Sequence, residues 1–167
     1  MATTVHVNVH AYTTTHVATN LIRSLKQIVV ACGLDASKLL GIWQILERGV
    51  AVWLGDGHLR RLILEVYDPA TKRLATRFDF EIDYGYHALG NGDLWLDPDT
   101  VNYAVRKCGA VPSSCWYDIL AQAAPGHRHV DGWTTGILRS TAGLRRRGVG
   151  AAVGGGNLGA SLNYWRS

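Results

Sequence analysis

The sequence lacks the features that mark several classes of protein. It has three cysteines, Cys32, Cys108 and Cys115, an odd and widely spaced set that predicts no disulfide framework and fits a reducing cytoplasm. No apolar run approaches the roughly 20 residues that a membrane span needs. The first residues carry neither the basic nor the apolar region of a secretory signal. We therefore expect a cytoplasmic protein with no membrane partner.

Length and composition favour one folded domain. A chain of 167 residues with 47% hydrophobic and 18% charged residues can bury a substantial core and is too apolar for a disordered polymer. The charge is unevenly distributed. Residues 128–167 carry six arginines and one aspartate, whereas residues 1–127 are close to neutral. The same tail holds nine of the 19 glycines. The chain therefore divides into a body, residues 1–124, and a basic, glycine-rich tail, residues 125–167.

Catalytic motifs are largely missing. The sequence has no G-x-S-x-G elbow and no Walker lysine, and the glycines at 148–156 do not match a dinucleotide fingerprint. Asp79 and Glu81 could hold Mg²⁺ in a nucleotidyltransferase, but residues 70–73 upstream contain no glycine-rich phosphate turn. This enzyme stays an alternative, and we expect no catalytic centre, cofactor or metal.

The histidines and cysteines are also expected to be structural or exposed. No cysteine stands at zinc spacing from the histidines, which predicts solvent-exposed side chains rather than metal ligands at positions 6, 10, 16, 127 and 129. Cys32 and Cys108 fall on apolar helix faces, where cysteine is usually a small core residue. Cys115 begins a strand and has no predicted base beside it.

Hydrophobic periodicity predicts an α+β fold with helices on one face of an antiparallel sheet. Strands are expected at residues 3–12, 59–68, 73–83 and 115–123, and helices at 15–32, 35–54 and 97–108. The two middle strands flank the turn at 68–72 and form a hairpin. One face of that hairpin, with Arg77, Asp79, Glu81 and Asp83, is expected to be solvated. The tail shows no clean period of either kind.

The tail combines three features that indicate a segment able to dock. Its aromatic residues Trp133, Tyr164 and Trp165 can each bury a large apolar area. Its glycines permit more than one backbone path. Its arginines Arg139, Arg145, Arg146 and Arg147 can face an acidic surface or nucleic acid. A basic-tailed adaptor that binds nucleic acid is therefore a second alternative.

Several segments, in order along the chain, resemble bacterial HORMA-domain proteins of CBASS antiphage operons, of the family 1 type. They include THVATNLIRSLK (15–26), LGDGHL (54–59), LEVYDPAT (64–71), DGW (131–133) and YWR (164–166). The resemblance implies a HORMA-like antiparallel sheet backed by three helices and followed by a C-terminal safety belt. It covers nearly the whole chain and is loosest at residues 85–95 and 144–160.

The resemblance also implies a function. HORMA proteins are non-enzymatic adaptors that switch between open and closed states, and the closed belt wraps a closure-motif peptide lying against the sheet. The implied partners are that peptide, a cGAS/DncV-like cyclic-oligonucleotide synthase that the closed form activates, and an AAA+ remodelling ATPase that pulls on the N-terminus and reopens the domain. Nucleic acid can be a further partner in the synthase complex.

Site residues follow from placing this scheme on the sequence. The peptide would lie along Cys115, Trp116, Tyr117, Asp118, Ile119 and Leu120, beneath a belt that packs across strand 115–123. Trp133, Tyr164 and Trp165 would anchor the belt, with Trp133 also touching the peptide, and Pro125-Gly126 would be its hinge. Arg139 and Arg145–Arg147 would face either the synthase or the acidic strand face at 79–83.

Overall fold

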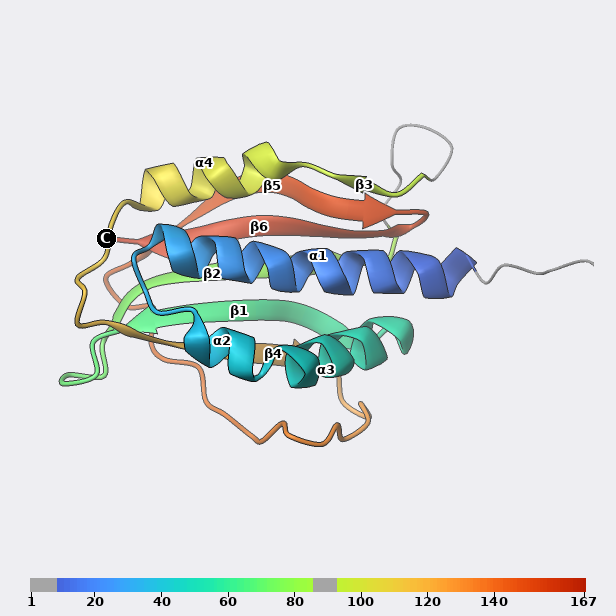
Figure 1. Ribbon diagram of the computed structural model, residues 1–167, viewed down its shortest axis with the longest axis horizontal. Helices are drawn as coiled ribbons and strands as arrows, with labels where there is room; N and C mark the ends of the chain where they lie inside the picture. Colours follow the sequence, from blue (N-terminus) through green and yellow to red (C-terminus); the bar gives the residue numbers. More distant parts are fainter. Residues whose placement is uncertain (1–8, 86–92) are drawn as a thin grey trace, which may run out of the picture.

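A six-stranded antiparallel sheet carries the four helices of the described chain on one of its faces (Figure 1). The computed structural model describes residues 9–85 and 93–167. The strands lie in the order β3-β5-β6-β2-β1-β4. The elements are α1 (Val9–Ala31), α2 (Ser37–Gly41), α3 (Trp43–Gly55), β1 (Leu59–Tyr67), β2 (Leu74–Asp83), β3 (Trp95–Leu96), α4 (Pro98–Cys108), β4 (Trp116–Ala123), β5 (Arg145–Gly155) and β6 (Leu158–Arg166). The predicted antiparallel α+β fold is confirmed.

The core lies between the helices and the sheet. One stripe of α1, including Leu21, Leu25 and Ile28, is completely buried. It packs over alternate residues of the central strands, such as Leu64 and Phe78, which stand opposite each other across β1 and β2. The apolar faces that the helical and strand periodicities predict therefore pack against each other in one apolar layer.

The strand predicted at residues 3–12 is wrong at its C-terminal end. Residues 9–12 belong to α1, which is 23 residues long, and residues 3–8 lie outside the described residues. Tertiary packing explains the longer helix. Thr13 and Thr14 are buried, and their methyl groups approach Gly155 at the end of β5 and Gly55 at the end of α3. These contacts outweigh the β propensity of the segment.

The helix predicted over 35–54 is divided into α2 and α3. Ile42 leaves helical geometry between them, at φ −112° and ψ 12°. Tyr117 of β4 holds the start of α2, because its hydroxyl donates to the Asp35 carbonyl (2.6 Å) and accepts from the Leu39 amide (3.2 Å). The sheet is therefore backed by four helices in the described chain rather than three.

The expectation of a solvated face on β2 is wrong for its first half. Arg77 and Asp79 are buried, and they form an ion pair with 2.6 and 2.8 Å contacts. The indole of Trp165 stacks near the Arg77 guanidinium and donates to Asp79 (3.3 Å). The cause is topological: β2 is flanked by β1 and β6, so neighbouring side chains cover this face.

The tail is more regular than its sequence indicates. Residues 145–166 form the hairpin β5–β6, and β6 pairs with β2 over seven positions from Arg77–Trp165 to Asp83–Gly159. The hairpin turns at Gly156, where φ is +57°, a value that glycine adopts without strain. Strand periodicity is hidden in β5 because glycine and alanine take most of its apolar positions.

Cysteines and histidines occupy ordinary structural positions in the described chain. All three cysteines are buried and free, and burial raises the pKa of the Cys32 thiol to about 12. His16 is partly buried rather than exposed, with Nε2 2.8 Å from the Trp95 carbonyl. His127 and His129 are exposed, as expected. The side chains of His6 and His10 lie outside the described part.

Candidate functional site

One edge of the sheet is open for pairing. Within the described chain, β4 is hydrogen-bonded only to β1. The Ala124 amide donates inward to the His58 carbonyl on the β1 side, whereas the Tyr117 carbonyl accepts from Lys38 Nζ (2.6 Å). Because backbone groups alternate in direction along a strand, the amides and carbonyls of Ile119 and Ala121 also face away from β1. An edge of this kind can accept another strand.

The segment that joins β4 to β5, residues 126–144, passes around this edge. We call it the crossing segment. In Figure 1 it runs beyond α2 and α3 before it joins β5. Its first part lies along α3 on the helix side of the sheet. The Arg128 carbonyl accepts from the Trp53 indole (2.7 Å), and the Arg128 guanidinium forms a two-contact ion pair with Asp56 at the end of α3.

Trp133 is the second attachment to α3. Its indole donates to the Ile45 carbonyl (2.9 Å) and packs edge-on against Trp53, with ring centroids 4.9 Å apart. The ring lies directly over Gly49: a Cβ atom built there would be 2.2 Å from Trp133 Nε1. A glycine that is unfavourable inside a helix is therefore required by this close approach.

Arg139 attaches the crossing segment to the opposite face of the sheet. Leu64 and Val66 of β1 point into the core under the helices, so Glu65 between them points to the other side. Glu65 is completely buried and accepts from both the backbone amide and the guanidinium of Arg139, each at 2.8 Å. The guanidinium also donates to Asp118 (3.0 Å) and stacks 3.5 Å above the Tyr67 ring.

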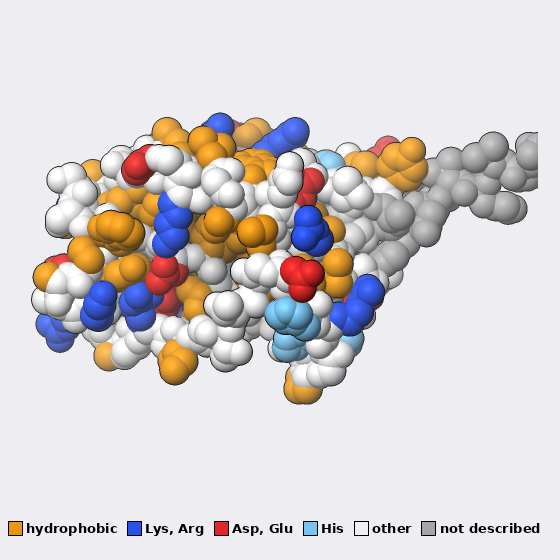
Figure 2. Space-filling view, turned by 60° about the horizontal axis from the view of Figure 1, so that its bottom comes forward, with side chains coloured by type: hydrophobic (Ala, Val, Ile, Leu, Met, Phe, Trp, Pro, Cys, Tyr) orange, Lys and Arg blue, Asp and Glu red, His pale blue; other side chains and the backbone are white. Residues whose placement is uncertain are grey.

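The attachments on the two faces flank a solvent-open cavity of about 890 Å³ beside β4. Its walls are β4, the helix side and the crossing segment: residues 118–123, Lys38, Ile42, Trp53, 127–129, 133–137 and Arg139. Figure 2 turns this side of the molecule forward and shows hydrophobic side chains along its middle and histidines gathered near one end. Ile137, in the crossing segment, is 88% exposed. An occupant of the cavity could cover it.

Charges at the cavity are paired across its walls. Asp118 accepts from Lys38 (2.9 Å) on α2 and from Arg139 on the crossing segment. Burial by itself raises the pKa of the Asp118 carboxyl, but hydrogen bonds and charges from Lys38 and Arg139 outweigh it and hold that pKa below its usual range. The carboxylate therefore links strand, helix and crossing segment at neutral pH.

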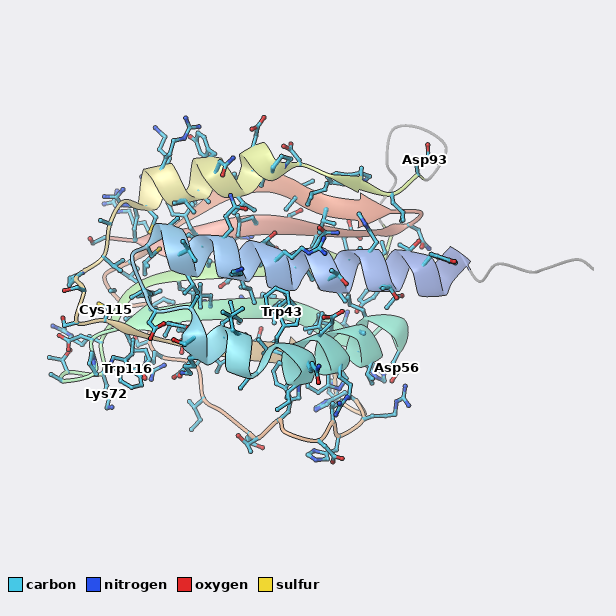
Figure 3. All side chains as sticks on the ribbon, viewed as in Figure 1. Trp43, Asp56, Lys72, Asp93, Cys115 and Trp116 are labelled. Atoms are coloured by element: carbon cyan, nitrogen blue, oxygen red, sulfur yellow. The ribbon has the colours of Figure 1, made fainter. Side chains whose placement is uncertain are left out.

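The sequence-predicted peptide residues divide among the cavity, the core and the surface. Asp118, Ile119 and Leu120 line the cavity, as does Trp133. Cys115 and Tyr117 are buried, and Trp116 is 58% exposed at the start of β4, next to the turn that contains Lys72 (Figure 3). Pro125 directly precedes the crossing segment, and Gly126, the first residue of that segment, has a φ of +85°.

Other predicted residues lie away from β4. Tyr164 and Trp165 are on β6, which two strands separate from β4, so the expectation that the whole tail packs across residues 115–123 is wrong. Only the crossing segment does so. Arg146 pairs with Glu81 on the acidic face (2.9 Å), as one of the two alternatives expected. Arg145 and Arg147 are exposed at the other face.

Sequence reasoning missed two partners of the crossing segment, Gly49 and Glu65. Gly49 looks like a weak position in a helix, and only the Trp133 ring above it explains the absence of a side chain. Glu65 looks like an ordinary polar residue of an alternating strand, although it is completely buried beneath Arg139. A carboxylate within the apolar run 62–66 was the available signal.

The alternative magnesium site is not favoured by the geometry. Asp79 is bound by Arg77 and lies 3.4 Å from Arg61, and Glu81 is paired with Arg146. Among the described residues, no group of three or more histidine, cysteine or acidic side chains is arranged to hold a metal ion. None of the helices over this same part of the chain is long and apolar enough to span a membrane.

The sequence matches, over residues 2–167, the family model described as Bacterial HORMA domain 2. The resemblance to bacterial HORMA-domain proteins is confirmed, and the matching model is number 2 rather than the type numbered 1. No match is found among curated protein sequences.

Solved structures share the fold at low identity. A chain of the mitotic checkpoint complex superposes with a TM-score of 0.69 at 10% identity, covering 92% of this chain and 98% of that one. HTP-2 of C. elegans bound to the HIM-3 closure motif gives 0.61 at 14% identity, over 90% and 89%. A chain of the CdnC:HORMA-deltaN complex of E. coli MS115-1 gives 0.60 at 10% identity, over 100% and 93%.

Proposed function

The chain belongs to the bacterial HORMA domain 2 family, and from that premise we propose that it is a peptide-binding adaptor without a catalytic centre. The observation that carries this proposal is the crossing segment, which is attached to α3 by Trp133 and to the far face of the sheet by Arg139. Between these attachments it encloses the open edge of β4. The crossing segment is the belt, and residues 125–167 act as one C-terminal region hinged at Pro125-Gly126.

The occupant is a closure-motif peptide that adds a strand to β4. The outward backbone groups of Ile119 and Ala121 supply hydrogen bonds that any extended peptide can use. Selectivity then comes from side chains that line the walls, including Trp133, Leu120 and Ile137. HTP-2, which shares the fold, is bound to a closure motif in its own structure.

Enclosure has a kinetic consequence. A peptide held between β4 and the crossing segment can leave only by threading out or after Trp133 or Arg139 has detached, so its dissociation is slow. An adaptor of this kind benefits from a remodelling ATPase of the AAA+ class that opens it. We include that ATPase in the proposal, with the N-terminal segment as its handle.

The signalling partner is a cyclic-oligonucleotide synthase. A chain of similar fold comes from a complex of HORMA with CdnC in E. coli MS115-1, which supports this choice. In the proposed scheme the peptide-bound form of this chain binds and activates the synthase in antiphage defence, in the cytoplasm.

Replacing Trp133 tests the proposal. Overlapping peptides from the partner synthase and neighbouring proteins are titrated against the full chain, and the tightest binder is kept as the probe. Trp133→Ala should weaken its binding by more than about 1 kcal/mol, as for an interface hot spot. Trp43→Ala is the matched control, since Trp43 bonds to Glu47 and packs toward α1, outside the cavity (Figure 3). Equal affinities of wild type and Trp133→Ala would contradict the assigned site.

A further inference from the structure

A second hollow lies at the other side of the molecule, where α4 meets the open end of the β5–β6 hairpin. It has a volume of about 470 Å³ and is lined by Tyr103, Lys107, Arg145, Arg147, Gly148, Tyr164, Arg166 and Ser167. Four of the lining side chains are cationic, and none is acidic. We call these four, Lys107, Arg145, Arg147 and Arg166, the basic cluster.

The register of the hairpin forces these charges together. Arg145 stands directly opposite Arg166, and Arg147 lies two residues further along the same face. Like charges directly across a strand pair are destabilising. Arg166 has a structural role, because its guanidinium donates to the Lys107 carbonyl at the end of α4. That bond caps the helix, whose C-terminal carbonyls supply only a partial negative charge.

No side-chain carboxylate of the described chain is paired with the cluster. Over residues 9–85 and 93–167, no ion pair involves Lys107, Arg145, Arg147 or Arg166. Arg146, between two members of the cluster, points to the opposite face and is paired with Glu81. The charge of Arg146, the middle arginine of the triplet, is thus paired with a carboxylate, whereas Arg145 and Arg147 beside the hollow form no ion pair. This arrangement suits a ligand that supplies the missing negative charge.

From this geometry we propose that the hollow binds the phosphates of a nucleotide, either free or as part of a single strand of nucleic acid. Guanidinium groups match phosphate oxygens with paired hydrogen bonds, and several of them around one hollow favour a group that concentrates charge. Tyr103 of α4 is 42% exposed at the same hollow. The Lys107 ammonium lies over its ring, 5.5 Å from the centroid, so a base can stack on the ring face that Lys107 leaves open. A volume of this size is in the range of small-ligand sites.

The site is separate from the peptide cavity. It is built by α4, β5 and β6, whereas the cavity is built by β4, the helix side at α2 and α3, and the crossing segment, and the two share no lining residue. Failure of nucleotide binding would therefore leave the proposed peptide function intact, and loss of peptide binding would leave the nucleotide site testable.

The test measures binding of the full chain to a fluorescein-labelled oligothymidylate and to ATP, by fluorescence anisotropy and by competition. Arg145→Gln combined with Arg147→Gln should weaken the binding of both probes by at least about tenfold. It should also lower the salt-dependence slope of oligonucleotide binding by about 1.4, because each lost contact to a single strand contributes about 0.7. Arg23→Gln combined with Arg146→Gln removes the same net charge outside the hollow, from exposed positions on α1 and β5. This control should stay within about twofold of wild type.

Tyr103→Leu separates base stacking from charge. It should weaken ATP and the oligonucleotide but leave inorganic tripolyphosphate, which has no base, unchanged. If ATP has a higher affinity per site than the oligonucleotide, the ligand of the hollow is a free nucleotide. If the oligonucleotide has the higher affinity, the ligand is a strand of nucleic acid. The proposal is overturned if the two double variants behave alike, if neither probe binds, or if an oligoglutamate peptide competes better than ATP.

Discussion

Gly49 and Trp133 form a contact that depends on the absence of one methyl group. In α3 the glycine costs helix stability, yet the Trp133 ring occupies the place of its side chain and donates to the Ile45 carbonyl. Gly132 makes a similarly close contact with Ile45: a Cβ atom built on Gly132 would lie 2.7 Å from the Cγ2 methyl group of Ile45. Gly132 also has a φ of +91°. The attachment of the crossing segment to α3 is therefore set at single residues.

Gly49→Ala should displace Trp133 without unfolding the body. Alanine favours the helix by about 1 kcal/mol, whereas its methyl group excludes the indole. We expect an unchanged or higher Tm, a red shift of tryptophan emission, and peptide binding weakened by about tenfold or more. Gly41→Ala is the control, because no atom lies within 4 Å of a Cβ at that helical glycine. A Gly49→Ala variant that binds peptide normally would show that this contact is dispensable.

Asp118 gives the attachment a defined pH dependence. Its carboxyl has a lowered pKa in the folded state, so it contributes stability above the unfolded pKa of about 4 and loses that contribution as the pH falls through the folded value. The difference in Tm between wild type and Asp118→Asn should shrink as the pH is lowered from about 5 toward 3.

Thermal melts across this pH range check the assignment. Asp131→Asn serves as the comparison, since Asp131 is almost fully exposed and 3.7 Å from His129. Because the Asp131 side chain is exposed, Asp131→Asn should change the Tm less than Asp118→Asn does at neutral pH. If the difference in Tm between wild type and Asp118→Asn stays constant over this pH range, the contacts of Asp118 with Lys38 and Arg139 do not stabilise the folded state.

At the scale of elements, β2 is the strand on which the two parts of the chain meet. Its partner β1 belongs to the body, and its partner β6 belongs to the tail. The outer face of β2 holds Arg77 and Asp79 as a buried pair, which Trp165 of β6 and Arg61 of β1 also contact. The tail therefore completes the polar face of a central strand as well as its hydrogen bonding.

Asp79→Ala should lower the free energy of unfolding by about 3–5 kcal/mol, because it leaves the Arg77 guanidinium buried without its carboxylate. Glu81→Ala, on the same face, breaks a half-exposed pair and should cost less than about 1 kcal/mol. Urea unfolding measures both. Glu81→Ala should also retain synthase activation, because we propose no catalytic role for this strand. Loss of activation by a folded Glu81→Ala variant would revive the magnesium enzyme.

At the scale of the whole molecule, the chain forms a loop beside the peptide cavity. The loop runs from β4 through the crossing segment to the hairpin β5–β6, and strand pairing through β2 and β1 closes it. The loop is held at its far end by strand pairing: β6 buries Leu158, Ala160, Leu162 and Tyr164 in the common core. A chain that ends near residue 124 would lose this strand. Testing the belt by truncation would thus remove part of the core.

Cutting the loop is a cleaner test. A protease site inserted between Thr134 and Thr135, both exposed, interrupts the crossing segment while β5 and β6 stay paired with β2. After cleavage the protein should remain folded by circular dichroism, and the dissociation rate of a prebound peptide should rise by about tenfold or more. An uncleavable insertion of equal length controls for the added residues. Unchanged dissociation after complete cleavage would contradict enclosure.

The sequence by itself determined the parts with strong local patterns. The apolar stripe of α1, the hairpin of β1 and β2, and the helix that begins with Asp97-Pro98 are readable because burial repeats at the period of each element. The basic tail with Trp133 was also readable from composition. These features follow from the choice of residue at each position and need no knowledge of distant neighbours.

Only the tertiary structure decided the rest, since the deciding contacts join residues far apart in sequence. Residues 9–12 are helical because Thr13 and Thr14 pack against the ends of β5 and α3, and β5 is a strand because β6 pairs with it. Arg77 and Asp79 are buried because two strands flank them. Gly49 beneath Trp133 and Glu65 beneath Arg139 acquire their roles only when the crossing segment passes around β4.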